Sequence, residues 1–133
     1  MKIFVDTNIF LDVLFNRNDA VNVTRILNAC HQKRFEGYVA DITLLNIDYV
    51  AAKQTKNLRD FLALINQTFT VIGANNRIFE SALGIDHNDL EDVVQYLCAK
   101  NETCRVIVSN DKKFYRGKME VMNSTEFVKD YLV

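Results

Sequence analysis

Proline is absent from the 133-residue chain, and glycine, cysteine and histidine are scarce. The three cysteines are odd in number and show no C-x-x-C spacing, which argues against a disulfide framework, and two histidines add too few ligands for a structural zinc cluster. We expect the cysteines to be reduced and mostly buried, as in a cytoplasmic protein. Without proline, helix ends must be set by capping residues and by the four glycines, Gly37, Gly73, Gly84 and Gly117.

Long apolar runs and an overall basic charge are also absent. Only three apolar residues stand between Lys2 and Asp6, too few for the core of a signal peptide. No segment approaches the ~20 apolar residues that a membrane-spanning helix requires, so we expect a soluble cytoplasmic protein with no membrane association. With a formal net charge of −1, the protein as a whole does not attract nucleic acid electrostatically. Any such attraction has to come from local basic clusters, among them Lys112, Lys113 and Arg116.

Short β-type runs alternate with longer helical patterns along the chain, which is typical of α/β packing with a mostly parallel sheet. The length predicts one domain, residues 1–133, with enough buried surface for a core. Strands are predicted at Lys2–Val5, Tyr38–Ala40, Thr70–Ile72, Cys104–Val108 and Glu120–Met122. Helices are predicted at about Thr7–Phe15, Ala20–Lys33, Ile42–Gln54, Leu58–Thr68, Asn76–Leu83, Asp89–Lys100 and Thr125–Leu132.

Four stretches place an acid or its amide close to a junction between a strand and a helix. Ligands of an open α/β sheet bind outside the carboxyl ends of its strands, so these side chains are expected to converge on one site. Converging carboxylates raise one another's pKa unless a cation is bound, and carboxylates are the ligands that Mg²⁺ and Mn²⁺ prefer. The stretches are Ile3–Phe10, Ala40–Asn46, Asn88–Asp92 and Val106–Asp111.

Several of these residues also have a purely structural explanation. Asp6 stands at a favourable N-cap position, and Asp111 ends a Ser-Asn-Asp sequence that suits a turn. Asn88 followed by Glu91 resembles a capping box, so we leave Glu91 out of the predicted site.

Helical spacing shows which of the remaining polar residues can point in the same direction. Asp89 and Asp92, at positions i and i+3, lie on one helical face, and an acid beside the core edge requires a partner. Asn46 and Asp48 cannot point the same way, and periodicity does not choose between them.

Taken together, four motifs resemble the ordered motifs of a PIN domain, in particular the PilT N-terminus-like subgroup near the VapC-type toxins. They are Val5–Asp12, Thr43–Asn46, Leu90–Tyr96 and Val108–Phe114. The resemblance covers essentially the whole chain. It implies a three-layer α/β sandwich with a mostly parallel five-stranded sheet flanked by helices, and metal-dependent cleavage of RNA.

By position, the resemblance also implies roles for individual residues. Asn46 matches a catalytic position where many PIN nucleases carry Glu and some members of the subgroup carry Asn, and this departure lowers the charge of the site. Asn8 and Ser109 match supporting residues. The implied metal ligands are Asp6, Asp92 and Asp111, with Asp89 as an additional acid.

The implied reaction is hydrolysis of an RNA phosphodiester by water activated on Mg²⁺ or Mn²⁺. Single-stranded or loop RNA is favoured, because a flexible strand can bend its phosphate into a crevice. Lys112, Lys113 and Arg116 are expected to contact neighbouring phosphates. The family further implies an antitoxin protein as a partner and a homodimer.

Two alternatives stay open on the sequence alone. A haloacid-dehalogenase-like phosphatase also begins with an acid after the first strand, but it needs a second Asp where this chain has Asn8. A degenerate PIN domain that binds RNA or a protein partner without cutting is suggested by Asn46.

Overall fold

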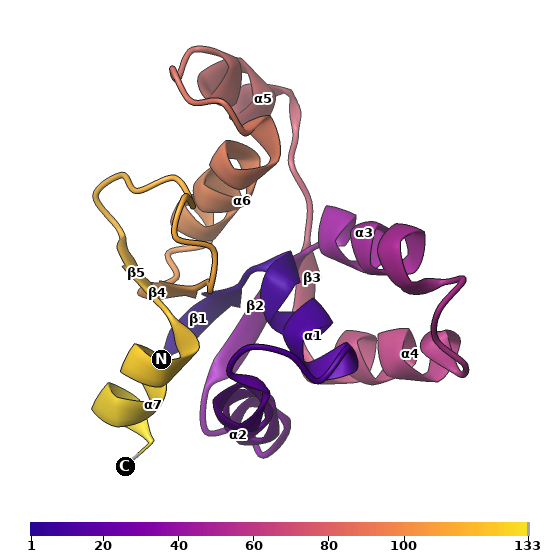
Figure 1. Ribbon diagram of the computed structural model, residues 1–133. Coiled ribbons are helices and arrows are strands. Elements are labelled where there is room, and N and C mark those ends of the chain that lie inside the picture. The colour runs from indigo at the N-terminus through magenta and orange to yellow at the C-terminus, as the bar shows by residue number, and fades with distance from the viewer. Residues whose placement is uncertain (133) are drawn as a thin grey trace.

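Five strands and seven helices follow one another over residues 1–132, the part of the chain that the computed structural model describes (Figure 1). The strands are β1 (Lys2–Val5), β2 (Glu36–Ala40), β3 (Thr70–Ile72), β4 (Val106–Val108) and β5 (Glu120–Met122). The helices are α1 (Thr7–Leu14), α2 (Ala20–His31), α3 (Asp41–Ala51), α4 (Leu58–Thr68), α5 (Asn76–Leu83), α6 (Leu90–Asn101) and α7 (Ser124–Tyr131).

This order of elements confirms the predicted one, and the differences lie at element ends, where bounds are least sharply defined. β2 begins earlier than predicted, at Glu36, and β4 begins later, at Val106. α1, α2 and α3 stop before their predicted ends. For α3 the reason is a turn, in which the amides of Gln54 and Thr55 both donate to the carbonyl of Ala51.

The five strands form one parallel sheet in the order β3-β2-β1-β4-β5. The chain builds outward from β1 to β3 and then returns to the other side of β1 to add β4 and β5. The strand order therefore reverses between β1 and β4, which is the point where open α/β sheets form their ligand crevice. Val5 pairs with Val108 there, so Asp6 and Ser109 leave the sheet side by side.

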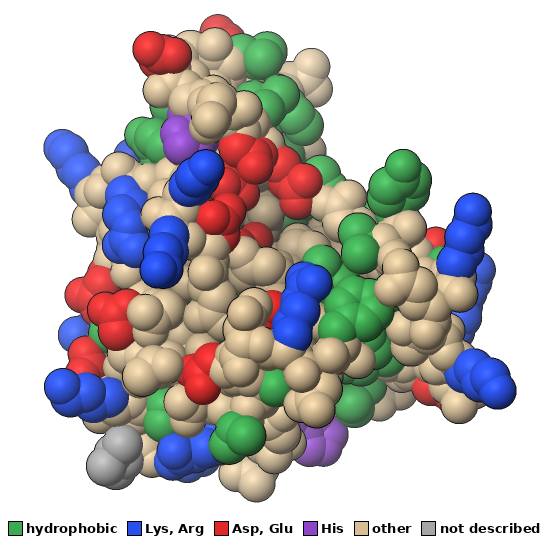
Figure 2. All heavy atoms as spheres, viewed as in Figure 1, with side chains coloured by type: hydrophobic (Ala, Val, Ile, Leu, Met, Phe, Trp, Pro, Cys, Tyr) green, Lys and Arg blue, Asp and Glu red, His purple; other side chains and the backbone are tan. Residues whose placement is uncertain are grey.

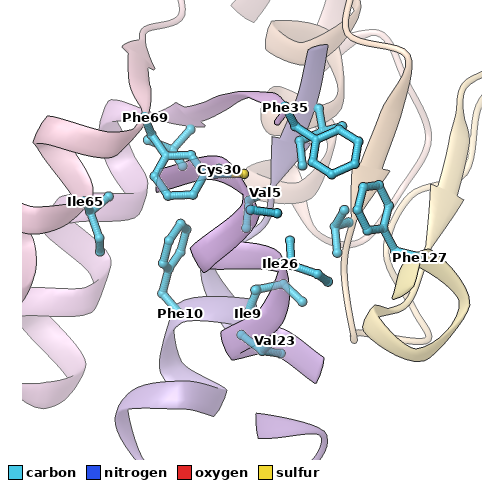
Figure 3. Packing of buried hydrophobic residues seen from close by; sticks show 14 of the residues in the cluster. Val5, Ile9, Phe10, Val23, Ile26, Cys30, Phe35, Ile65, Phe69 and Phe127 are labelled. Atoms are coloured by element: carbon cyan, nitrogen blue, oxygen red, sulfur yellow. The ribbon is translucent and has the colours of Figure 1, made fainter. Parts of the chain in front are cut away.

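Helices cover both faces of the sheet, as the predicted three-layer fold requires. The side chains of β1 alternate, with Ile3 and Val5 in the core formed with α1, α2, α3, α4 and α7 and Phe4 in the core formed with α5 and α6. In the first core Phe10 packs edge-on against Phe69, with ring centroids 5.3 Å apart (Figure 3). These two cores fix the strand ends that carry the polar residues described below.

The cysteines are buried and unpaired, as predicted. Burial raises the pKa of the Cys30 thiol to about 12 and that of Cys98 to about 11, so neither is a reactive thiolate near neutral pH. No helix within residues 1–132 has the length and apolar content needed to cross a membrane.

Candidate active site

The ends of β1 and β4 bring two of the predicted acids together through one hydroxyl group. Asp6 is 3% exposed, and one of its carboxylate oxygens accepts a hydrogen bond from Ser109 Oγ at 2.7 Å. The same hydroxyl accepts from the backbone N–H of Asp111 at 3.1 Å. The side chain of Asp6 makes no capping hydrogen bond to α1 although its backbone is in the N-cap position, so capping does not explain this buried acid.

Asp92 approaches this pair from the first turn of α6. It is 6% exposed, and its Oδ2 atom is buried without a hydrogen-bond partner among the described residues. Asp89 is the N-cap of α6 and accepts from the backbone N–H of Asp92 at 3.2 Å. The predicted cap at Asn88 is therefore wrong by one position, because the adjacent Asp89 supplies the same acceptor chemistry to the helix.

The acids are close enough to change one another's ionisation. Burial, together with the negative charges of Asp6, Asp89 and Asp111, raises the pKa of Asp92 to about 8. Burial likewise raises the pKa of Asp6 to about 6 against the hydrogen bond from Ser109, with an added contribution from Asp111. The ionisation of these acids is therefore coupled.

Glu91, which the sequence analysis left out of the site, belongs to this acidic group. Its Oε1 atom accepts from Asn46 Nδ2 at 2.6 Å and from Gln95 Nε2 at 3.4 Å, which ties α3 to α6. Burial and the charge of Asp89 raise its pKa, and the hydrogen bond from Asn46 lowers it. Asn46 therefore faces the acids, which resolves the ambiguity with Asp48.

Gln95 is a further residue that sequence reasoning missed. It is fully buried one helical turn after Glu91, and its side chain also reaches Asp6, whose pKa it lowers by hydrogen bonding. Its Oε1 atom is buried and has no hydrogen-bond partner within residues 1–132, like Oδ2 of Asp92. The sequence carries no signal that could have found it, because glutamine side chains are normally exposed and only the structure shows that this one is buried.

Two unpartnered buried oxygens beside several carboxylates form a donor set that suits a hard cation. Within residues 1–132, however, no three His, Cys, Asp or Glu side chains are placed closely enough to surround an ion as they stand. The predicted close packing of Asp6, Asp92 and Asp111 around one cation position is thus not confirmed. The described residues form a cluster of acids in which two buried oxygen atoms, Asp92 Oδ2 and Gln95 Oε1, accept no hydrogen bond.

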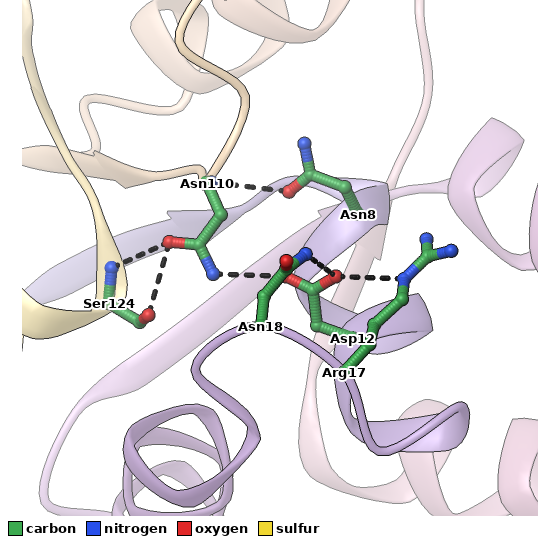
Figure 4. A network of polar contacts seen from close by, with 6 residues as sticks. All are labelled: Asn8, Asp12, Arg17, Asn18, Asn110 and Ser124. Carbon is green, nitrogen blue, oxygen red and sulfur yellow. Dashed lines mark hydrogen bonds and ion pairs between the residues drawn. The ribbon is translucent and has the colours of Figure 1, made fainter.

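A second polar network holds the turn after β4 from the other side (Figure 4). Asn110 donates its backbone N–H to Asn8 Oδ1 at 3.3 Å and its Nδ2 to Asp12 Oδ2 at 3.0 Å. Its Oδ1 accepts from the backbone N–H of Ser124 at 2.9 Å, at the start of α7. Asn8 therefore braces the turn that carries Asp111. Asn110, whose residue type also suits a turn, joins α1 to α7.

The predicted phosphate-binding residues lie on the segment between β4 and β5. Lys112 and Lys113 are exposed, and the guanidinium of Arg116 donates to the carbonyl of Val121 at 3.0 Å. Lys112 and Arg116 line a polar hollow of about 290 Å³ that also borders Asp111. Figure 2 shows basic side chains gathered over this segment, beside a group of acidic side chains over α6.

Comparison with known proteins gives three kinds of match. A family model described as "PIN domain" matches residues 2–113. A curated relative, "Ribonuclease VapC1" of Aquifex aeolicus (strain VF5), is 34% identical over 137 residues, covering 95% of this chain and 92% of that protein.

Solved structures match the fold over nearly all of both chains. One is a toxin-antitoxin complex from Klebsiella pneumoniae, with a TM-score of 0.69, 21% identity and coverage of 92% of this chain and 97% of the other. Another is VapBC2 from Rickettsia felis bound to a DNA fragment from its promoter, with a TM-score of 0.68, 18% identity and coverage of 92% and 98%. At these identities the structural matches bear on the fold alone.

Proposed function

The chain belongs to the PIN-domain family, and from this premise we propose that it is a metal-dependent endoribonuclease that hydrolyses phosphodiester bonds in single-stranded or loop RNA. The single observation that carries the proposal is Asp92. Its carboxylate is buried among Asp6, Asp89 and Asp111, its pKa is raised to about 8, and one of its oxygens has no partner among the described residues. Such a group is costly to keep ionised unless a cation or substrate offsets it. The named relative, a ribonuclease, supports the same conclusion.

The donor chemistry of the site fits Mg²⁺ or Mn²⁺. Asp6, Asp92 and Asp111 would hold the cation directly or through water, with Asp89 adding negative charge. All of these ligands are carboxylate oxygens, which hard divalent cations prefer over the nitrogen and sulfur ligands of zinc sites. When bound, such a cation would lower the pKa of a water molecule and offset negative charge on the phosphoryl oxygens.

The chain's own residues then orient the acids. The hydroxyl group of Ser109 donates a hydrogen bond to Asp6 and accepts one from the backbone N–H of Asp111. One hydroxyl group therefore fixes the relative position of these two residues. Asn46 donates to Glu91 and keeps that carboxylate turned toward α3. Such hydrogen bonds fix the carboxylates before substrate arrives, which reduces the cost of arranging them during the reaction.

RNA is proposed to enter across the segment between β4 and β5. Lys112, Lys113 and Arg116 would neutralise phosphates next to the one that is cleaved. The polar hollow bordered by Lys112, Arg116 and Asp111 provides space for a nucleotide on that side. An extended single strand can place a phosphate at the acids and its neighbours at these cations, whereas a stiff duplex cannot bend into the crevice.

A metal titration combined with an RNA cleavage assay tests the proposal. We expect purified protein to cut a single-stranded RNA only when Mg²⁺ or Mn²⁺ is added, and chelation to stop the reaction reversibly. Asp6→Asn serves as the inactive control, with circular dichroism to show that it is folded. Cleavage that persists in the chelator, or that the Asp6→Asn protein retains, would contradict a metal-dependent mechanism at these acids.

We further propose that the chain is the toxin of a toxin-antitoxin module and forms a homodimer. The 34% identical relative named Ribonuclease VapC1 supports this assignment, as does the resemblance of the four motifs to those of VapC-type toxins. A small reading frame directly upstream of the gene would be the expected source of the antitoxin. Co-expression with that protein should yield a stable complex in which RNA cleavage is suppressed, and light scattering should give the mass of two copies for the chain alone. Unaffected cleavage in the complex would argue against the module.

A further inference from the structure

Arg17 is held in place by a buried carboxylate at the end of α1. Its Nε atom lies 3.1 Å from Asp12 Oδ1, and the Asp12 side chain is only 2% exposed. The backbone N–H of Arg17 also donates to the carbonyl of Asp12, at 2.9 Å. The guanidinium lies over the ring of Phe15, 5.4 Å from its centroid. Side chain and backbone are thus fixed together.

The turn that presents Arg17 is built for one conformation. Asn16 and Asn18, on either side, both adopt left-handed backbone angles, with φ of 49° and 51°. Asparagine tolerates this region better than most residues. Asn18 also donates its Nδ2 to Asp12 Oδ1 at 2.9 Å, so the turn is closed on the same carboxylate that holds Arg17.

The outer edge of the guanidinium is left available. Half of the Arg17 side chain, 49%, is exposed, and the hydrogen bonds found within residues 1–132 use only its Nε atom. In Figure 4 both terminal nitrogens point away from Asp12. A guanidinium fixed through Nε and free at its terminal nitrogens is arranged to take a phosphate through two parallel hydrogen bonds.

The position of this cation relates it to the acidic group. Asp12, which holds Arg17, also binds Asn110, the residue that precedes Asp111. Figure 2 shows basic side chains to the left of the acids, over the β4–β5 segment, and below them, over α1. Lys2 and Arg17 are the only cations among the first 24 residues, and Lys2 lies at the far end of β1. Arg17 lies in the turn directly after α1, which ends at Leu14.

We infer that Arg17 binds a backbone phosphate of the RNA on the α1 side of the acids, opposite the phosphates contacted by Lys112, Lys113 and Arg116. The inference rests on the proposed ribonuclease function and sets the path of the strand, which crosses the acids from the β4–β5 segment to the turn after α1. Asp12 acts as a positioning residue, because its buried carboxylate removes the freedom that an exposed arginine would otherwise lose on binding.

The test compares Arg17→Gln with Arg25→Gln as a matched control. Arg25 lies on α2, where its guanidinium donates to the carbonyl of Leu132. Binding of a fluorescent single-stranded RNA is measured in chelator over a range of salt concentrations, and cleavage kinetics are measured with Mn²⁺. For Arg17→Gln we expect about tenfold weaker binding and a correspondingly higher KM with little change in kcat. The slope of log Kd against log salt should fall by about 0.7, the value for one phosphate contact on a single strand.

A second variant, Arg17→Lys, separates charge from geometry. It should keep the salt slope but recover only part of the affinity, because lysine cannot form the paired hydrogen bonds. Wild-type affinity and slope in Arg17→Gln, or the same losses in Arg25→Gln, would overturn the inference. If wild-type protein binds RNA without cutting it, the ribonuclease proposal fails, while Arg17-dependent binding still supports the inference. A wild-type protein that neither binds nor cuts overturns both.

Discussion

Two buried acids on helices that cover opposite faces of the sheet, Asp12 on α1 and Asp92 on α6, have different surroundings. Asp12 is 1% exposed and accepts hydrogen bonds from Arg17, Asn18 and Asn110, so both of its oxygens are used. Asp92 is 6% exposed, faces other acids, and has a buried oxygen without a partner among the described residues. Burial alone therefore does not distinguish a structural acid from a functional one.

The two acids differ in whether the protein itself provides positively charged or hydrogen-bond-donating groups around the carboxylate. Around Asp12 the protein itself supplies them, and the carboxylate joins α1 to the turn after β4. Around Asp92 the neighbours are negative, so the missing partner has to come from outside. Unpaired buried charge is expensive, and a protein retains it where a ligand completes the site.

Removing the charge of either acid gives the largest expected contrast. Asp92→Asn, like Asp6→Asn, should abolish Mg²⁺- or Mn²⁺-dependent RNA cleavage, because each change removes a ligand charge and keeps the shape of the side chain. The fold should be retained, since relief of repulsion favours the protein without metal. Cleavage rates and circular dichroism on the purified variants check both parts. Normal cleavage by Asp92→Asn would place the reaction elsewhere.

Asp12→Asn should show the opposite pattern. Its amide would present a donor to groups that are themselves donors, so we expect the free energy of unfolding to fall by about 2–3 kcal/mol. Denaturant unfolding measures this loss, with Asp19→Asn, another acid in a hydrogen-bonded cluster but a more exposed one, as the control for a smaller effect. Among molecules that remain folded, kcat should change little, because Asp12 contacts Arg17, Asn18 and Asn110 and none of the proposed metal ligands. Unchanged stability would mean that the network around Asp12 is not structural.

Sequence reasoning located the acids because strand topology is readable in short apolar runs. Asp6 and Asp111 follow buried strands, and the carboxyl ends of parallel strands share one edge of the sheet, so their meeting could be predicted without coordinates. The resemblance to PIN domains, which the family and relative matches confirm, added the order of the motifs.

The features of the site that could not be predicted from the sequence depend on contacts between distant residues or on a choice between adjacent capping residues. Asn110 and Asp12 are separated by 98 positions, and neither stands out from ordinary turn or helix chemistry. Glu91 was misassigned because Asn88 and Asp89 are both good caps, and a shift of one residue changes which acid is left for the site. Gln95 needed knowledge of its burial.

The pH dependence of stability sharpens the comparison further. The folded-state pKa of Asp92 is about 8 and that of Asp6 about 6, both above their unfolded values near 4. The folded protein therefore binds more protons than the unfolded chain between about pH 4 and pH 8, and metal-free protein should lose stability as pH rises through this window. Denaturant unfolding at several pH values measures the fall. Asp92→Asn should flatten it above about pH 6 and gain about 1–2 kcal/mol at pH 8, a value reduced for partial solvation. A metal-free wild type that becomes more stable toward pH 8 would contradict the shifted acids.

The smallest expected effect concerns Asn46, whose amide lies 2.6 Å from Glu91. Asn46→Glu replaces a donor by a second carboxylate, so we expect Mn²⁺ to bind severalfold more tightly, because hard cations prefer anionic oxygen. Turnover should stay flat or fall, since Glu91 loses the hydrogen bond that orients it. Isothermal titration with Mn²⁺ and the cleavage rate measure the two effects separately. Asp48→Asn, which changes a carboxylate on another side of α3, is the matched control and should alter neither. Higher turnover would mean that Asn46 only fills the place of a missing carboxylate, and unchanged Mn²⁺ affinity would mean that Asn46 does not belong to the metal site.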